Sequence, residues 1–305
     1  MMLVRVVVVL LIAATCQIQS FSFNPKKFGA AVVLSGGFWC VPTPVIAAPE
    51  GSIVVLGSNG KTGDQIVRIL SEKGYAVQPT AYSLDKAANK IQSAAPSNVY
   101  PVIRADVTDP SSLSEALKNA RAVVFAASAS RGGGSAEKVD YIGVDNVAKA
   151  CIQLQIPRLV VISSGAITRP DSLGYKITNL FGNIMSYKLQ GEDALRADYA
   201  SADPKLSYAI VRPGGLTDGK AAGVSEIEIN QGDAISGEVA RADVAECVSA
   251  VAISKTLPSA VTFEMYNRES GGPLQGNLPR QSGYERLGPT YEEIFMGLKS
   301  NFNKL

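Results

Sequence analysis

The chain has 305 residues, of which 46% are hydrophobic and 18% charged, so it can bury the core of one large α/β domain. It contains no histidine, which excludes Ser-His-Asp and Cys-His catalysis and histidine-ligated zinc. All three charges within residues 1–49 are basic, and the remainder carries 26 basic and 27 acidic residues. This balance gives no electrostatic basis for nucleic-acid binding.

The first 49 residues are predicted to be a targeting sequence. Arg5 and the apolar run 6–14 are typical of a signal peptide over residues 1–20, which is too short to span a bilayer. Residues 21–49 begin with Phe21 and contain no acid, and together with the signal peptide they resemble the two-part plastid presequence of algae with secondary plastids. The uncharged stretch 28–49 is compatible with a thylakoid-transfer signal or with a membrane anchor, although Pro42 and Pro44 weaken a spanning helix. Ordinary secretion is the alternative to plastid import.

The domain is expected over residues 50–305, where strand and helix patterns alternate. Repeated βα units joined by short loops predict right-handed crossovers and a single doubly wound, Rossmann-type parallel sheet with helices on both faces. Residues 269–289 are rich in Gly and Pro and are expected to form a surface loop. Strands are predicted over 53–56, 75–81, 100–105, 122–127, 158–163, 208–211, 227–229 and 261–265, and helices over 64–73, 84–93, 110–120, 136–154, 184–199, 241–254 and 291–301.

A glycine-rich junction follows the first of these strands. Three glycines at spacing three allow a tight turn, a close approach to a pyrophosphate and close packing of the next helix on the sheet. The helix N-terminus then directs N–H groups and a positive dipole end at the phosphates. The junction therefore predicts a dinucleotide site formed by Gly57, Ser58, Asn59, Gly60, Lys61, Thr62 and Gly63.

This junction has two other interpretations. An ATP- or GTP-binding phosphate loop would need a glycine where the chain has Val55, inside the strand. A glycine-rich turn that binds nothing is the simpler alternative.

Further motifs follow in order at the ends of the later strands. The third strand leads into Ala-Asp-Val-Thr-Asp, the fourth ends in Ala-Ala-Ser, and the fifth runs into Ser-Ser-Gly. Residues 182–192 read GNIMSYKLQGE, and the sixth strand ends in Ile-Val-Arg-Pro-Gly-Gly-Leu. Over about residues 52–265 these motifs together resemble atypical short-chain dehydrogenase/reductases, the NAD(P)-binding branch found in plastid and cyanobacterial proteins.

This resemblance implies further cofactor contacts. It places the Asp106 carboxylate near the adenine amino group, and it lets the backbone of the small residues after the fourth strand pass the cofactor. The ends of parallel strands line the ligand crevice, so the glycines after the sixth strand are expected beside the nicotinamide. The cofactor-binding residues predicted in this way are Asp106, Val107, Ala126, Ala127, Ser128, Lys188, Pro213, Gly214 and Gly215.

Coenzyme choice depends on the tip of the second strand, where an acid favours NAD and a basic residue favours NADP. Tyr82 and Ser83 occupy this tip, and family members often carry arginine in place of the tyrosine. Because the tip has no acid, and because Ser58, Lys61 and Ser83 offer further donors, NADP is favoured, with NAD as the alternative.

Catalysis in the resembled family uses a tyrosine four residues before a lysine on one helix face, with a serine that orients the substrate. Ser164 and Lys188 fill the serine and lysine positions, but Ile184 stands where the tyrosine belongs. Tyr187 is about 100° round the helix from Lys188 and cannot take over the role of the missing tyrosine. Tyr175, expected in the loop before this helix, is the remaining candidate, with a packing or surface role as the simpler interpretation. The candidate catalytic residues are therefore Ser164, Lys188 and Tyr175.

Two functions agree with these patterns. The first is a plastid NAD(P)H-dependent oxidoreductase that lacks the usual tyrosine and acts on a small-molecule substrate the sequence does not define. The second is a non-catalytic NAD(P)H-binding redox sensor or assembly factor associated with a plastid membrane complex, in the stroma or at the thylakoid. The cysteines are scattered without a CxxC motif, so no metal site is expected, and Cys151 and Cys247 are predicted to be buried free thiols.

Overall fold

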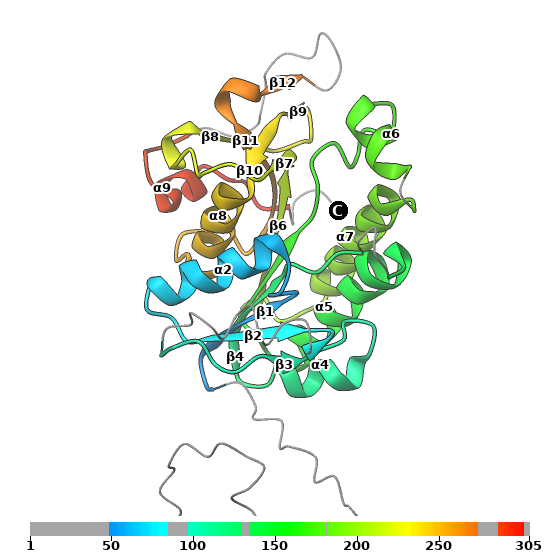
Figure 1. The fold of residues 1–305 in the computed structure, drawn as a ribbon, viewed down its shortest axis with the longest axis vertical. Helices are drawn as coiled ribbons and strands as arrows, with labels where there is room; N and C mark the ends of the chain where they lie inside the picture. The colour runs from blue at the N-terminus through cyan, green and yellow to red at the C-terminus, as the bar shows by residue number, and fades with distance from the viewer. Residues whose placement is uncertain (1–48, 85–96, 130–133, 181, 274–285, 302–305) are drawn as a thin grey trace, which may run out of the picture. The chain divides into compact units, whose positions relative to one another are not determined.

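A computed structural model of the chain describes residues 49–84, 97–129, 134–180, 182–273 and 286–301 (Figure 1). Residues 1–48 of the targeting segment predicted over 1–49 and nearly all of the helix predicted over 84–93 lie outside the described residues. The same holds for residues 274–285 of the predicted surface loop.

An eight-stranded sheet forms the centre of the domain, in the order β3-β2-β1-β4-β5-β6-β11-β8. Neighbouring strands in it are parallel except at the edge, where β8 runs antiparallel to β11. The predicted doubly wound sheet is therefore confirmed, with one antiparallel edge strand. The strands are β1 (Ser52–Leu56), β2 (Val77–Ala81), β3 (Ile103–Arg104), β4 (Ala120–Phe125), β5 (Arg158–Ile162), β6 (Ser207–Pro213), β8 (Ile227–Asn230) and β11 (Ala260–Asn267).

Helices cover both faces of this sheet because its central strands are apolar on both sides. In β1, Ile53 and Val55 enter the core under α2 (Lys61–Glu72) and α8 (Arg241–Ile253). Val54 and Leu56 enter the opposite core, beneath α4 (Pro110–Ala116), α5 (Gly143–Gln153) and α7 (Ile184–Ala200). A last helix, α9 (Tyr291–Met296), packs on the α8 side and is shorter than predicted.

Short elements that the sequence did not predict lie beyond the carboxyl ends of the central strands (Figure 1). They are α6 (Leu173–Asn179) and two small ladders, in which β7 (Gly215–Thr217) pairs with β10 (Glu238–Ala240) and β9 (Ile235–Ser236) pairs with β12 (Gly272–Pro273). The helix predicted over 136–154 is also divided, since a π-helical segment, Glu137–Ile142, precedes α5. These elements lie near the carboxyl ends of the strands, where a ligand of this fold binds.

Cys151 and Cys247 are fully buried free thiols, as predicted, and burial raises the pKa of both. Within the described part of the chain, no helix has the length and apolar character needed to cross a membrane. No cluster of His, Cys, Asp and Glu suited to a metal ion occurs among those residues either.

Candidate functional site

The glycine-rich loop connects β1 to the start of α2 and fits tightly against the end of β4. Gly57 has φ +79°, a conformation that L side chains rarely adopt, and an added Cβ would lie 2.8 Å from the backbone of Ala127. A Cβ on Gly63 would overlap the carbonyl oxygen of Gly57. Gly60 is the N-cap residue of α2, and no side chain caps this helix N-terminus. The loop is therefore a compact backbone cradle that ends in uncapped helix N–H groups.

Two polar side chains of the loop have protein partners. Ser58 is fully buried, and both its amide and its hydroxyl donate to the Thr80 carbonyl, the hydroxyl at 2.8 Å. Ser58 therefore connects the loop to β2, and its hydroxyl donates to this carbonyl rather than to a phosphate. The exposed Lys61 ammonium lies 2.6 Å from the Asp218 carboxylate, and the Lys61 hydrogen bond lowers the pKa of Asp218. Arg241, the first residue of α8, also binds Asp218.

The tip of β2 carries Tyr82, a residue that is 68% exposed, followed by Ser83. The guanidinium carbon of Arg104, at the end of β3, lies 5.9 Å from the centroid of the Tyr82 ring. Arg104 also lies 3.9 Å from Asp106, whose carboxylate accepts the amide and hydroxyl of Thr108. The sequence-predicted Tyr82 and Asp106 are thus brought together, with an arginine between them that the sequence reading missed.

The end of β4 is connected to Lys188 through a buried aspartate. Asp140, in the π-helical segment, accepts the Ser128 hydroxyl at 2.7 Å and the Ala129 amide at 2.9 Å. The Lys188 ammonium lies 2.8 Å from the same carboxylate, and the Asp140 side chain is 0% exposed. The predicted Ser128 and Lys188 therefore belong to one network, whose centre was not among the predicted residues.

The close approach of two helical segments explains this pairing. Gly191 follows Lys188 by one helical turn, on the same side of α7. A Cβ on Gly191 would overlap the carbonyl oxygen of Asp140. The small residue therefore lets the π-helical backbone lie directly against α7, within reach of the lysine.

Pro213 ends β6, Gly214 follows it and Gly215 begins β7; all three are predicted to lie at the nicotinamide end. A Cβ on Gly214 would overlap the Gly237 carbonyl, whereas one on Gly215 would make ordinary contact with Glu238. The Gly215 amide donates to the Gly237 carbonyl at 2.8 Å. Packing against Gly237, the residue between β9 and β10, is thus one reason for glycine at position 214, in addition to the expected space for a nicotinamide ring.

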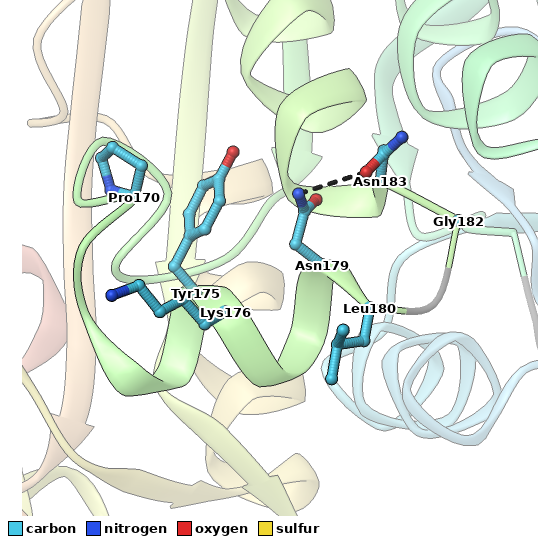
Figure 2. A pocket seen from close by; sticks show the side chains of 7 residues that line it. All are labelled: Pro170, Tyr175, Lys176, Asn179, Leu180, Gly182 and Asn183. Carbon is cyan, nitrogen blue, oxygen red and sulfur yellow. Dashed lines mark hydrogen bonds between the residues drawn. The ribbon is translucent and has the colours of Figure 1, made fainter.

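Tyr175 was expected in a loop, and that expectation is wrong, because it lies in α6, whose N-terminus is capped by Ser172. Its ring rises from the helix between Pro170 and Asn179, into an open pocket of about 590 Å³ (Figure 2). The residues that line this pocket do not include Lys188 or Ser164.

Of the other two catalytic candidates, Ser164 lies just beyond a strand and Lys188 lies in a helix. Ser164 is the second residue after β5, half-buried, and its hydroxyl donates to the Gly165 carbonyl at 3.2 Å. Lys188 lies one turn into α7, which begins at Ile184, the residue in the expected tyrosine position. The first turn of the helix thus presents an apolar side chain where the resembled family has a phenol.

A buried ionic network lies on the α7 side of β6 and β11, and sequence reasoning missed it. Arg212 binds Glu192 at 2.5 Å and Glu264 at 3.0 Å, all three nearly inaccessible. Burial opposes the charge of Glu192, but Arg212 lowers its pKa below the ordinary value. Burial raises the pKa of Glu264 to about 7 despite Arg212, since Asp233 adds a second carboxylate nearby.

The residues present fit a bound dinucleotide. A cradle in which two glycines have no space for a Cβ, and a helix N-terminus without a side-chain cap, suit a pyrophosphate. Because β2, β3, β4 and β6 belong to one parallel part of the sheet, their carboxyl ends lie along the same edge, where ligands of this fold bind. Fold and site together define a Rossmann-type dinucleotide-binding protein.

Comparison with known proteins agrees with this assignment to the dinucleotide-binding proteins. Residues 57–255 match the model of an NAD(P)H-binding family, and the chain belongs to this family. The solved structures that it resembles include an oxidoreductase from Lactococcus lactis, with a TM-score of 0.58 and 21% identity over 71% of this chain and 90% of that one. A wide-type short-chain dehydrogenase/reductase from Veillonella parvula in complex with NADP has a TM-score of 0.56 and 18% identity over 72% and 96% of the two chains. The enzyme WbmH from Bordetella bronchiseptica in complex with NAD+ has a TM-score of 0.53 and 14% identity over 74% and 78%.

Sequence relatives support the plastid branch of this family. An uncharacterized chloroplastic protein of Arabidopsis thaliana is 30% identical over 72% of this chain and 76% of its own length. Protein TIC 62 of Arabidopsis thaliana, also chloroplastic, is 25% identical over 65% of this chain and 32% of its own length. The chloroplastic divinyl chlorophyllide a 8-vinyl-reductase of Oryza sativa subsp. indica is 27% identical over 68% and 53%. This chain thus spans only about a third of the length of TIC 62 and about half of the length of the vinyl-reductase.

Proposed function

We propose that the protein is a plastid NADPH-dependent oxidoreductase that acts without the usual tyrosine. The observation that carries this proposal is the network of Lys188, Asp140 and Ser128, which fixes an ammonium group beside the end of β4. That strand end also forms one wall of the glycine cradle, since Gly57 fits against Ala127. A lysine held at this place suits hydrogen bonding to the nicotinamide ribose.

Each part of the chain has a distinct task in this proposal. The loop from Gly57 to Gly63 would hold the pyrophosphate, and Pro213 to Gly215 would border the nicotinamide ring. The bound cofactor supplies a hydride to the substrate. Ser164 would orient the substrate, and the proton would come from water, from the substrate or from Tyr175, because Ile184 has no proton to transfer.

The experiment is titration of the full chain with NADPH and NADH by nicotinamide fluorescence. The bound signal is then followed over time with a panel of carbonyls, quinones and divinyl chlorophyllide, since one relative is named for reducing the last. Lys188→Ala should reduce turnover or cofactor affinity. Lys149→Ala is the matched control, because Lys149 pairs with Asp145 at 2.7 Å but does so on the exposed surface of α5. Equal activity of wild type and Lys188→Ala would count against the proposal.

A second candidate is an NADPH-binding redox sensor or assembly factor of a plastid membrane complex. Ile184 in the tyrosine position favours it, and so does Asp140, because its carboxylate already balances the Lys188 charge. Tight NADPH binding without oxidation across the panel, together with a partner captured only in one redox state of the cofactor, would support this function over the first.

A further inference from the structure

We infer that Arg104, at the end of β3, is the residue that selects NADPH by binding its 2′-phosphate. The inference deepens the proposed function and rests on it. Proteins of this fold that use NADP commonly place an arginine near the adenosine ribose. Here the tip of β2 carries Tyr82 instead, so the positive charge has to come from another element.

The sheet register brings Arg104 to this place. Arg104 pairs with Ala81 across the β2–β3 ladder, directly beside the strand end that precedes Tyr82. Its guanidinium carbon lies 5.9 Å from the Tyr82 ring centroid, which is within the range of a cation–π contact. Arg104, on a strand two positions from the one that precedes the glycine loop, thus places its guanidinium beside the tip of β2.

The guanidinium remains accessible to an anion. The Arg104 side chain is 58% exposed, and its ion pair with Asp106 is long, at 3.9 Å. An exposed pair of this length contributes little free energy, so a phosphate dianion can compete for the arginine. Within the described residues, Tyr82 and Asp106 are the side chains that contact this guanidinium.

Tyr82 and Asp106 also define the surroundings of the Arg104 guanidinium. A guanidinium that lies over an aromatic ring keeps the N–H groups at its edge available to an anion. Asp106 is the residue that the family resemblance places near the adenine amino group. Arg104 therefore lies between an aromatic surface and the predicted adenine contact, where the ribose of a bound dinucleotide is expected.

The test is equilibrium binding of four probes to the full chain: NADPH, NADH, 2′,5′-ADP and 5′-AMP. Arg104→Gln should weaken NADPH and 2′,5′-ADP by about tenfold to a hundredfold, as expected for a lost charge-assisted hydrogen bond, and leave NADH and 5′-AMP within about threefold. Arg121→Gln is the matched control, because Arg121 lies 5.2 Å over the Tyr75 ring but belongs to the beginning of β4, away from the crevice. It should leave all four affinities unchanged.

A double variant distinguishes the loss of the positive charge from a loss of folding. The double variant Arg104→Gln with Tyr82→Arg moves the charge to the tip of β2 and should regain most of the NADPH preference. An unchanged NADPH-to-NADH ratio in Arg104→Gln would overturn the inference while the proposed function stands. A wild type that prefers NADH would overturn the inference together with the NADPH dependence of the proposed function. A wild type that binds neither dinucleotide would overturn the proposed function itself.

Discussion

Removing the charge of Asp140 should destabilise the protein considerably, because this carboxylate is buried and has three partners. Asp140→Asn keeps the shape of the side chain and can still accept one or two of the hydrogen bonds from Ser128, Ala129 and Lys188. It leaves the Lys188 ammonium, only 12% exposed, without a counter-charge. Breaking a buried ion pair on one side typically costs about 3–5 kcal/mol, and the retained hydrogen bonds place the expected loss near 3 kcal/mol.

Urea unfolding followed by circular dichroism measures this loss. With a denaturant slope of about 3 kcal/mol per molar for a domain of this size, the midpoint should fall by about 1 M. Lys188→Met should cost a similar amount, since it leaves a buried carboxylate with Ser128 and Ala129 alone. The double variant should cost clearly less than the two single variants together, with a coupling energy of about 2 kcal/mol.

The control for this cycle is Asp145→Asn on α5. Asp145 pairs with Lys149 at 2.7 Å, but the lysine side chain is 60% exposed. The expected loss is therefore at most about 0.5 kcal/mol. If Asp140→Asn lost no more than this control and showed no coupling to Lys188, the network would not be the fixed centre of the site.

Three further variants probe the loop, the ionic network and the pyrophosphate end. Gly57→Ala should lower the free energy of unfolding by about 2–3 kcal/mol in thermal or urea unfolding, because φ +79° and the backbone of Ala127 both exclude a Cβ; wild-type stability would contradict this. The pKa of Glu264 rises from 4.5 to about 7 on folding, so its contribution to stability is present below pH 4.5 and is lost as the pH rises through 7. Relative to Glu264→Gln, the free energy of unfolding of the wild type should fall by up to about 3 kcal/mol between pH 4.5 and 7, as measured by urea titrations at each pH. Parallel profiles of unfolding free energy against pH for the two proteins would refute the assignment. Asp218→Asn removes a negative charge that holds Lys61, so NADPH and NADH affinities should both rise by about twofold to threefold in fluorescence titrations, an effect that 0.5 M NaCl should reduce.

The sequence predicted the fold well because its signals were local. The apolar runs of β1 and β4, the glycines that follow β1, and Asp109 as the cap of α4 each depend on a few neighbouring residues. The direction of β8 could not be predicted in this way, because the apolar pattern of a strand is the same whether its neighbour runs parallel or antiparallel. The ladders of β7 with β10 and β9 with β12 contain only two or three residues per strand, too few for any periodicity.

The site was predicted only in part, because its key contacts are distant in sequence. Asp140 and Lys188 belong to different helical segments, and an aspartate in a helical pattern ordinarily indicates a solvent-exposed face. The signal that was present is Gly191, a glycine inside a helical pattern, which often marks a close approach of another backbone. Arg104 was missed for a similar reason, since its position beside Tyr82 follows from the register of β2 and β3 rather than from spacing.

The glycines of the loop differ in what their presence implies, and this difference separates folding from binding. Gly57 and Gly63 are required by the surrounding backbone, so they would be needed even in a loop that binds nothing. Gly60 has φ −72°, and its added Cβ would come no closer than 3.2 Å to the Gly57 carbonyl oxygen. Gly60→Ala should therefore change the free energy of unfolding by only about 1 kcal/mol, the usual range for a helix-cap position.

Binding should respond to Gly60→Ala much more strongly than folding does. A methyl group at the N-cap of α2 lies where a pyrophosphate would approach the helix N–H groups. We expect the affinities for NADPH and NADH to fall together by at least about tenfold, since both carry the same pyrophosphate. Unfolding curves close to wild type combined with lost binding would show that glycine at this position serves the cofactor. Unchanged binding would mean that the loop is scaffold, as the glycines at 57 and 63 alone would allow.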